Sequence, residues 1–465
     1  MMFVNAAYNY NVAVISDSGQ QLSYSELSEQ ASRLYATIGK RTLVFCLCKN
    51  AVESLVGYVA FINNRVVPLM LDATMEFDLL SRLLEAYTPE YIWLPTERSG
   101  ELNAFQSVYE FQDYTLLRSN VAHSLPLHNS LALLLTTSGS TGSPKLVRLS
   151  YENVLANAQS IAEYLSIDDK ERPITTLPMH YSFGLSVINS HLLRGATILL
   201  TNRSLMEKEF WQFLKNEKAT SLSGVPYTYE MLKRLRFFRM DFPSLTTLTQ
   251  AGGKLSVELN KEFVEYCVAS NKRFIVMYGQ TEATARMSYV PFERAIEKLG
   301  SIGVAIPGGE FSLVDDAGCA INDLDTQGEL VYRGANVSLG YAECGDDLAK
   351  GDENLGVLHT GDLAKRDSDG FYSIVGRKKR FIKLFGNRVN LDETERLLKP
   401  MVSECACVGT DDRMVVYITE QGRELEVKQF ISTKTGLNHT AFDVRFCPSI
   451  PKNSSGKTLY ANLEL

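Results

Sequence analysis

Short apolar runs alternate with longer amphipathic stretches along the first part of this chain. Residues 43–48 are apolar throughout and have the length of a buried strand, and the segments at 66–71 and 91–94 have the same character. The intervening stretches, 51–62 and 75–87, have the pattern of amphipathic helices. Strands that are apolar on both faces and separated by helices are typical of a parallel sheet covered by helices. The alternation therefore predicts an α/β fold.

The same alternation continues to about residue 280. We expect further strands at 131–136, 197–200, 219–222, 245–250 and 274–277, and helices at 152–164, 184–193, 208–216, 227–235 and 257–269. After about residue 300 the chain becomes rich in Gly, Asp and short strands, which is typical of antiparallel hairpins. The predicted large domain therefore consists of α/β sheets and ends in a β-subdomain.

A basic segment at 376–380 marks the predicted domain boundary. We expect a large N-terminal domain at 1–376 and a small, mobile α+β C-terminal domain at 377–465. The small domain has 15 Lys and Arg against 11 Asp and Glu, whereas the rest of the chain has 32 against 43. A small basic domain beside a large acidic one suits a cap that closes over an anion.

Composition argues against several classes of partner and site. The 465 residues carry a net charge of −7, so no overall positive field attracts nucleic acid, which is not an expected partner. No apolar run approaches the roughly 18 residues of a membrane span, and no signal peptide is visible, so we expect a cytoplasmic protein. The eight Cys form no Cys-x-x-Cys motif and the six His do not cluster, which argues against structural zinc.

A loop rich in Gly and hydroxyl residues follows the predicted strand at 131–136. Residues 136–145 read Thr-Thr-Ser-Gly-Ser-Thr-Gly-Ser-Pro-Lys. Backbone N–H groups and hydroxyls in such a loop can face a phosphate chain, and Lys145 adds positive charge. The loop lacks the Gly-Lys-Ser/Thr ending of a Walker A motif, which argues against a P-loop nucleoside triphosphatase. A flexible Ser/Gly turn remains the alternative.

Four more segments carry candidate chemistry. Residues 278–282 combine an aromatic ring that can stack on a base, a hydroxyl for a phosphate and a carboxylate for Mg²⁺. The turn at 359–362 presents a carboxylate that can accept both hydroxyls of a ribose, although a surface Asx-turn is the simpler interpretation. The basic segment at 376–388 and the Lys-containing turn at 451–457 complete the set.

In this order, the segments resemble one family, the adenylate-forming enzymes, which include acyl-CoA synthetases, adenylation domains of nonribosomal peptide synthetases and firefly luciferase. The resemblance covers nearly the whole chain, and extends to Leu-Pro-Met-His-Tyr-Ser-Phe-Gly-Leu at 177–185 and Gly-Glu-Leu-Val-Tyr-Arg-Gly at 328–334. It implies that a carboxylate attacks the α-phosphate of ATP, giving an acyl-adenylate and pyrophosphate. The thiol of CoA, or of a phosphopantetheine arm on a separate acyl or peptidyl carrier protein, then attacks the acyl group.

The resemblance also implies cofactors and residue roles. ATP and Mg²⁺ are the implied cofactors, with CoA or phosphopantetheine as the acceptor. The residues expected to bind the nucleotide are Thr137, Ser138, Gly139, Ser140, Thr141, Gly142, Lys145, Gly252, Tyr278, Gly279, Gln280, Thr281, Asp362, Arg377 and Lys457. Among them, Tyr278 is expected to stack on adenine and Thr281 to contact the α-phosphate. Glu282 is expected to hold Mg²⁺, and Asp362 with Arg377 to bind the ribose.

The catalytic residues implied by the resemblance are Lys457, Thr281, Glu282 and Lys383. Lys457 is expected to act in adenylation, and Lys383, on the opposite face of the small domain, in thiol transfer. Lys379 matches the hinge position about which the small domain rotates between the two steps. The first step brings a carboxylate against an anionic phosphate, so fixed positive charge lowers the barrier. One lysine at about 4 Å, in an effective dielectric near 20, contributes roughly 4 kcal/mol, or about a thousandfold in rate.

The expected acyl pocket comprises His180, Ser182, Gly184, Ala251 and Gly253. Gly184 stands where amino-acid-activating relatives carry an aspartate that pairs with the substrate ammonium, because a buried cation needs an anion. No acid lies at 175–189, which favours a fatty or aryl acid as the substrate. Gly184 and the segment 251–253 lack side-chain bulk and are expected to admit an acyl chain. His180 either gates the pocket or is a satisfied polar residue near the core.

Leu146, Asn390 and Tyr460 depart from the family pattern without removing a charge that the chemistry needs. Two alternatives remain open: a stand-alone amino-acid adenylating enzyme that loads a carrier protein, and a non-catalytic nucleotide-binding relative. A third interpretation compares Ser454-x-x-Lys457 and the Lys-Thr-Gly at 434–436 with penicillin-binding proteins, but the order of the two motifs argues against it.

Overall fold

A computed structural model describes residues 3, 5–120, 125–136, 145–384, 387–410, 413–435, 438–452, 456 and 458–464. The chain forms two compact units, Met1–Glu310 with Tyr332–Leu358 and Phe311–Val331 with His359–Leu465. The predicted boundary after residue 376 lies inside the second unit. A separate small domain at 377–465 therefore stays a proposal.

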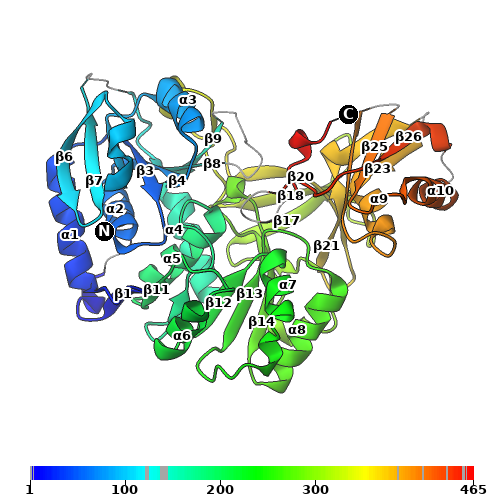
Figure 1. Cartoon of the computed structure of the whole chain (residues 1–465), viewed down its shortest axis with the longest axis horizontal. Coiled ribbons are helices and arrows are strands. Elements are labelled where there is room, and N and C mark those ends of the chain that lie inside the picture. Colours follow the sequence, from blue (N-terminus) through cyan, green and yellow to red (C-terminus); the bar gives the residue numbers. More distant parts are fainter. Residues whose placement is uncertain are drawn as a thin grey trace. The chain divides into compact units, whose positions relative to one another are not determined.

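The first unit contains an eight-stranded sheet within the described residues, in the order β19-β9-β8-β4-β3-β5-β7-β6 (Figure 1). Its parallel centre is β3 (Leu43–Cys48), β4 (Val67–Asp72), β5 (Tyr91–Pro95) and β8 (Leu131–Thr136). The antiparallel neighbours are β6 (Phe105–Phe111), β7 (Tyr114–Ser119), β9 (Leu146–Ser150) and β19 (Gly340–Ala342). The parallel sheet expected from the strands at 43–48, 66–71 and 91–94 is found at the centre. Antiparallel strands extend it at both edges, and the two-residue connection between β6 and β7 can join only antiparallel strands.

The second large sheet of this unit has the order β16-β15-β14-β13-β12-β10-β11-β1-β2. Its strands are β1 (Val12–Ser16), β2 (Gln21–Ser23), β10 (Pro173–Ile174), β11 (Ile198–Leu200), β12 (Ser221–Gly224), β13 (Thr247–Gln250), β14 (Arg273–Tyr278), β15 (Ser288–Tyr289) and β16 (Val304–Ala305). Neighbours from β1 through β11, β10, β12 and β13 to β14 run parallel. The expected α/β architecture is confirmed in both sheets.

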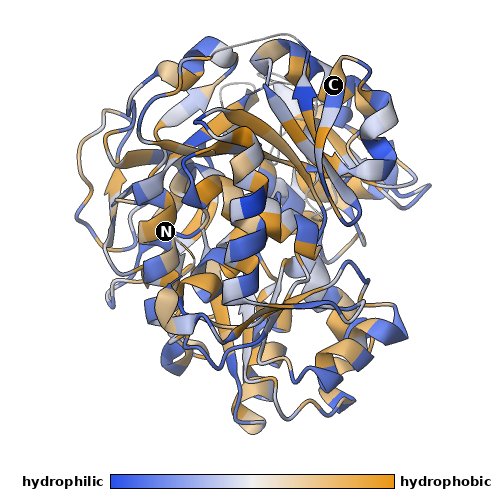
Figure 2. Ribbon diagram, turned by 90° about the vertical axis from the view of Figure 1, so that its left-hand side faces the viewer, coloured by the Kyte–Doolittle hydropathy of each residue, from blue (hydrophilic) through white to orange (hydrophobic). Residues whose placement is uncertain are grey.

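Helices cover the two sheets of the first unit. They are α1 (Tyr24–Ile38), α2 (Val52–Asn63), α3 (Phe77–Tyr87), α4 (Tyr151–Tyr164), α5 (Ser182–Leu193), α6 (Lys208–Asn216), α7 (Pro226–Arg234) and α8 (Val257–Ala269). Side-chain caps begin several of them: in α8, the Ser256 side chain accepts a hydrogen bond from the Leu259 N–H at 3.2 Å. Figure 2 shows hydrophobic residues concentrated on the strands, whereas hydrophobic and hydrophilic residues alternate along the helices. The apolar core of the unit therefore lies between strands and helix faces.

Arg148 fixes one edge of the eight-stranded sheet. Its side chain is fully buried, and its guanidinium donates to the carbonyl oxygens of Leu339 at 3.0 Å and Tyr341 at 2.9 Å and to the carboxylate of Glu353. Buried charges are tolerated when they are paired and fully hydrogen-bonded. Arg148 thus joins β9 to β19, which lies about 190 residues further along the chain.

The second unit holds most of the sheet β17-β18-β20-β21 and two smaller sheets. The strands are β17 (Gly309–Val314), β18 (Gly328–Gly334), β20 (Val357–Arg366), β21 (Tyr372–Arg377), β22 (Phe381–Leu384), β23 (Asn387–Asn390), β24 (Cys405–Thr410), β25 (Arg413–Ile418) and β26 (Phe442–Phe446). Helices α9 (Leu391–Leu398) and α10 (Glu424–Thr435) accompany a core that includes Leu398, Cys407 and Val416. Among the described helices of the whole chain, none is both long enough and apolar enough to cross a lipid bilayer.

Candidate active site

Two predicted site segments lie side by side at the carboxyl ends of parallel strands. The segment 251–253 follows β13, and Tyr278 ends the neighbouring strand β14, whose Val276 is opposite Gln250. Ligands of open α/β sheets bind at such carboxyl ends. Thr281 and Glu282 follow in a short 3-10 turn, η4 (Thr281–Ala283).

Gly279 lets the chain turn tightly at the end of β14. A Cβ atom at this position would lie 1.7 Å from the carbonyl oxygen of Ala285, so no other residue fits without moving the backbone. The turn continues through Thr284 and Ala285, whose φ angles of 58° and 127° lie in the left-handed region. Each such non-glycine residue costs about 1–3 kcal/mol, and strain of this kind is common at functional sites. Packing thus fixes the backbone on both sides of Glu282.

Tyr341 contacts both the predicted magnesium ligand, Glu282, and the predicted nucleotide-binding residue Lys145. Its hydroxyl donates a hydrogen bond of 2.8 Å to Oε1 of Glu282, and Nζ of Lys145 lies 3.7 Å from the centroid of its ring. Burial and the adjacent Glu282 charge raise the pKa of the Tyr341 hydroxyl, which therefore stays protonated and donates. Tyr341 reaches this place because β19 pairs with β9, the strand that begins directly after Lys145.

Thr281 contacts the acyl-site segment through Ser182. The two hydroxyl oxygens lie 3.1 Å apart, which joins η4 to the first residue of α5. On the other side of η4, the hydroxyl of Tyr278 accepts a hydrogen bond of 3.3 Å from Nε2 of Gln280. The structure therefore brings Thr281, Ser182 and the Tyr278 segment together, as the sequence predicts.

The glycines of the expected acyl pocket have packing roles, which corrects one sequence interpretation. A Cβ at Gly184 would lie 2.3 Å from the carbonyl oxygen of Pro178, so the missing side chain lets α5 approach that backbone, which occupies the space a side chain would take. At Gly252, with φ of 82°, a Cβ would meet the hydroxyl of Tyr181 at 2.8 Å. At Gly253 it would approach Pro226 at 3.1 Å.

His180 is a mostly buried neighbour of a carboxylate, with its side chain 17% exposed. Its Nε2 lies 3.8 Å from Oδ2 of Asp72, and its buried Nδ1 has no hydrogen-bond partner among the described residues. Burial lowers the pKa of His180, but Cys48 and Asp72 raise it more, and the net direction is upward. The surroundings of His180 therefore favour the protonated, charged form of its imidazole.

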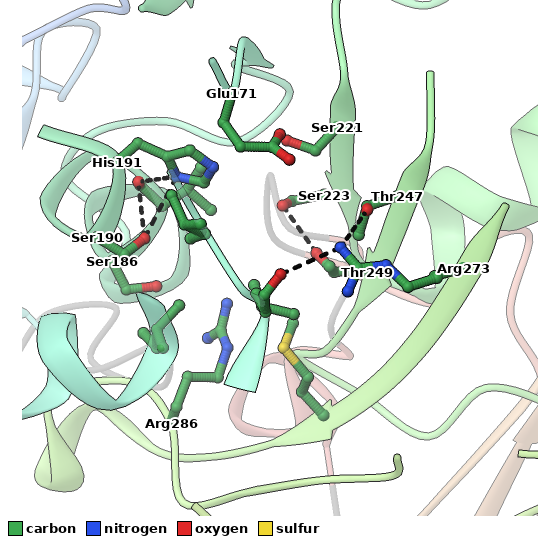
Figure 3. A pocket seen from close by; sticks show the side chains of 15 residues that line it. Glu171, Ser186, Ser190, His191, Ser221, Ser223, Thr247, Thr249, Arg273 and Arg286 are labelled. Atoms are coloured by element: carbon green, nitrogen blue, oxygen red, sulfur yellow. Dashed lines mark hydrogen bonds between the residues drawn. The ribbon is translucent and has the colours of Figure 1, made fainter. Parts of the chain in front are cut away.

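A cavity that the sequence did not reveal lies between α5 and the strands β12, β13 and β14 (Figure 3). Fifteen residues line it: Ile161, Leu165, Ile167, Glu171, Ser186, Val187, Ser190, His191, Ser221, Ser223, Thr247, Thr249, Arg273, Met277 and Arg286. Four of them, Ile161, Leu165, Ile167 and Met277, belong to the same apolar cluster as Ala251 of the expected acyl pocket. Part of the cavity wall therefore packs in one apolar cluster with Ala251.

The charged residues of the cavity are held in different ways. Glu171 accepts a hydrogen bond from the Thr220 hydroxyl, and burial raises the pKa of its carboxyl. Burial lowers the pKa of His191 to about 4, so the imidazole is neutral at pH 7. One terminal nitrogen of Arg273 donates to the carbonyl oxygen of Leu165 at 3.1 Å and to Oγ1 of Thr247 at 3.0 Å. Periodicity alone does not distinguish such residues from ordinary core.

In the second unit, the predicted ribose pair is adjacent. Asp362 of β20 is directly opposite Arg377 of β21, and Oδ1 of Asp362 lies 3.2 Å from Nε of Arg377. The Asp362 side chain is 5% exposed and the Arg377 side chain 63% exposed, so the pair presents one fixed acceptor beside one accessible cation. The hydroxyl of Thr360 accepts a hydrogen bond of 3.1 Å from the Asp362 N–H and holds the turn.

Several predicted site residues lie outside the described part of the chain. These are Thr137, Ser138, Gly139, Ser140, Thr141, Gly142 and Lys457. Lys379 belongs to η7 (Lys378–Arg380) and Lys383 to β22, but their side chains are not among those described. Their roles stay predictions.

Relatives of the chain were found by sequence. It is 31% identical to a probable CoA ligase of Humulus lupulus, over 71% of this chain and 63% of the relative. It is 32% identical to a long-chain-fatty-acid–CoA ligase of Escherichia coli O157:H7, over 72% of this chain and 61% of the relative. A 2-succinylbenzoate–CoA ligase of Listeria innocua is 24% identical over 94% of this chain and 93% of its own length. The chain spans 60% to 63% of the first three relatives that it matches.

The fold of the chain and its family match are consistent with these relatives. The fold is similar to that of o-succinylbenzoate CoA synthetase from Bacillus subtilis in complex with its acyl-adenylate intermediate, with a TM-score of 0.77 and 22% identity, covering 97% of this chain and 95% of the other. The family described as AMP-binding enzyme matches residues 4–342. This match spans well over half of the chain, which therefore belongs to the AMP-binding enzyme family.

Proposed function

We propose that this chain is an AMP-forming acid–thiol ligase, which activates a carboxylic acid as an acyl-adenylate and transfers the acyl group to CoA. The observation that carries the proposal is that Tyr341 bonds to Glu282 through its hydroxyl and contacts Lys145 through its ring, in a member of the AMP-binding enzyme family. Relatives named as CoA ligases support the choice of acceptor.

The described residues fit ATP and Mg²⁺. A carboxylate oxygen is the ligand type that Mg²⁺ prefers, and Glu282 offers one that Tyr341 already orients. Magnesium, when bound, would supply positive charge to the phosphates. Lys145 is proposed to contact the leaving phosphates, and Tyr278 to stack on adenine. Asp362 and Arg377 are proposed to bind the ribose, because a buried acceptor and a neighbouring cation suit vicinal hydroxyls.

The chain's own residues are proposed to lower the barrier by charge and position. In the first step a carboxylate oxygen bonds to the α-phosphorus while the bond to pyrophosphate breaks, so negative charges are forced together. Lys457 is proposed to offset this repulsion, and Thr281 to hold the α-phosphate. In the second step the thiol sulfur bonds to the acyl carbon and the bond from that carbon to AMP breaks. Lys383 is proposed to act in this thiol transfer, and Lys379 to be the hinge about which the small domain rotates between the two steps.

The proposed substrate is a fatty or aryl acid rather than an α-amino acid. Position 184 is a closely packed glycine, and no Asp or Glu occurs at 175–189 to pair with an ammonium group. An amino-acid-activating enzyme that loads a separate carrier protein is the alternative, and so is a non-catalytic relative. We also propose that nucleic acid is not a partner of this protein. We further propose that the protein is cytoplasmic, and imaging of a tagged chain would test this location.

Acid-dependent exchange of labelled pyrophosphate into ATP tests the proposal. A panel of fatty, aryl, hydroxy and amino acids is assayed first, and the active acids are then tested for transfer to CoA and to a carrier protein with its phosphopantetheine arm. Exchange with fatty or aryl acids followed by transfer to CoA is expected. Exchange only with amino acids would favour the alternative. Thermal stabilisation by ATP–Mg²⁺ without exchange would indicate a non-catalytic relative.

A further inference from the structure

Arg286 is a buried cation at the edge of the cavity shown in Figure 3. The residue is 2% exposed, and the carbon at the centre of its guanidinium lies 3.8 Å from the centroid of the Phe183 ring. It forms no ion pair with an Asp or Glu of the described residues, and its buried Nε has no hydrogen-bond partner among them. Tyr164 and Tyr181 are its polar neighbours.

The backbone of Arg286 is fixed so that its side chain reaches the cavity. Its carbonyl oxygen accepts hydrogen bonds from Nδ2 of Asn157 at 3.0 Å and of Asn336 at 2.8 Å. The preceding Ala285 has a left-handed φ of 127°, which turns the chain just before Arg286. Several interactions therefore maintain an arrangement that buries a charge.

Burial without an anion is unfavourable for a guanidinium. Desolvation lowers the pKa of Arg286, which means that its surroundings penalise the charged form. An arginine stays protonated in proteins, so the remedy is an anion or several strong acceptors. Arg273 of the same cavity obtains acceptors from Leu165 and Thr247, whereas Nε of Arg286 is left for a ligand.

The size of the cavity limits what can approach Arg286. Its free space, counted as positions open to the centre of a water molecule, is about 20 Å³. On this measure one water needs roughly 10–15 Å³, so the space suits a compact polar group rather than a long alkyl chain. Apolar side chains such as Leu165 and Met277 form other parts of the wall. In Figure 3, Glu171 lies on the far side of the pocket from Arg286.

We infer that Arg286 binds a second carboxylate of the substrate, so that the acid activated by this enzyme is a dicarboxylic acid with a short aliphatic or aryl body. The inference rests on the proposed function, which supplies the reacting carboxylate at the other end of the molecule. The inference restricts the aliphatic substrates of the proposed function to short dicarboxylic acids. A guanidinium can recognise a carboxylate through two parallel hydrogen bonds. A binding site that relies on such a pair discriminates strongly against analogues that lack the carboxylate.

Matched pairs of acids test the inference. Adipate is compared with hexanoate, and 3-(2-carboxyphenyl)propionate with 3-phenylpropionate, in the pyrophosphate exchange assay. In at least one of the two pairs, the wild-type protein is expected to have a kcat/KM at least tenfold higher for the diacid than for the monoacid. Arg286→Met is expected to abolish this preference while keeping activity on the monoacid. Arg286→Lys should retain part of the preference. Arg273→Met removes a charge from the same cavity. It should preserve the preference for the diacid, although the protein becomes less stable.

A binding measurement separates failure of the inference from failure of the proposed function. Calorimetric titration of each acid into the wild-type protein and Arg286→Met does not depend on catalysis. Tighter binding of the diacid that disappears in Arg286→Met, without any exchange, would support the inference and count against the function. Exchange in which the wild-type protein shows no preference for the diacid, or in which Arg286→Met keeps the wild-type preference, would overturn the inference and leave the function standing.

Discussion

The hydroxyl of Tyr341 donates a 2.8 Å hydrogen bond to the carboxylate of Glu282. The same tyrosine presents its ring to Lys145, whose Nζ lies 3.7 Å from the ring centroid. A cation above an aromatic face is attracted by the ring quadrupole, and a hydrogen bond to a carboxylate restricts its rotation. One side chain thus orients the proposed metal-binding acid and the proposed phosphate-binding lysine before any ligand arrives.

Tyr341→Phe should weaken ATP–Mg²⁺ binding moderately. The substitution keeps the ring beneath Lys145 but removes the hydrogen bond to Glu282, which contributes about 1 kcal/mol in a partly exposed place, or roughly fivefold. The measurement is the Mg²⁺ dependence of pyrophosphate exchange, with Tyr341→Leu expected to be worse because it also removes the ring. Tyr332→Phe is the control, since Tyr332 bonds to Asn336 instead. An unchanged Mg²⁺ dependence in Tyr341→Phe would show that this hydrogen bond has no role in binding.

Gly279→Ala should destabilise the first unit strongly. The added Cβ would lie 1.7 Å from the carbonyl oxygen of Ala285, so the backbone of the turn must move. We expect a loss of about 3 kcal/mol or more, at the upper end for single substitutions, measured from the urea midpoint. Gly100→Ala is matched to it, because a Cβ there meets no described atom within 4 Å. Equal stability of the two variants would contradict the close packing of the turn.

Asp362→Asn should remove discrimination between ATP and 2′-deoxy-ATP. The buried carboxylate is proposed to accept hydrogen bonds from the ribose hydroxyls, and a hydrogen bond to a charged group contributes about 1.5–3 kcal/mol. The wild-type protein should therefore bind ATP at least tenfold more tightly than 2′-deoxy-ATP. Arg377→Ala should reduce affinity less, because its side chain is mostly exposed. A wild-type protein with equal affinity for both nucleotides would exclude Asp362 from ribose recognition.

The elements closest to prediction are those determined by local sequence. The expected helix at 257–269 is found as Val257–Ala269, because Ser256 caps it and its apolar residues recur at helical spacing. The adjacency of Asp362 and Arg377 also follows from a short hairpin. The site segment 278–282 was visible because its residue types follow a buried strand.

Contacts between distant segments were not predictable in the same way. Tyr341 approaches Lys145 only because β19 joins the edge of a sheet whose other strands end near residue 150. Even the shorter-range contact at Gly184 was not predictable: the residue suggested free volume, but the carbonyl oxygen of Pro178, in the turn just before α5, occupies the space that a Cβ would take. Arg286 is next to a recognised motif, and yet only the packing of Phe183 and the strands shows that it is buried.

The stability of the first unit should fall as the pH falls from about 6.5 to 4. Burial lowers the pKa of His191 to about 4, whereas an unfolded histidine titrates near 6.5, so the unfolded chain binds more protons in this interval. The expected loss is about 2 kcal/mol between pH 7.5 and pH 5. His191→Gln should remove that part of the dependence in urea unfolding, whereas the exposed His359→Gln should leave it. An identical pH dependence in His191→Gln and the wild-type protein would contradict the burial of a neutral imidazole.

The transfer of oxygen from the acid to the nucleotide tests the central claim most directly. A carboxylic acid active in the exchange panel is labelled with ¹⁸O in both carboxylate oxygens and incubated with the protein, ATP, Mg²⁺ and CoA, and the products are weighed by mass spectrometry. Attack of the carboxylate on the α-phosphorus predicts AMP that carries one ¹⁸O, with unlabelled pyrophosphate. Formation of ADP, or of labelled phosphate with unlabelled AMP, would contradict adenylate formation by this chain.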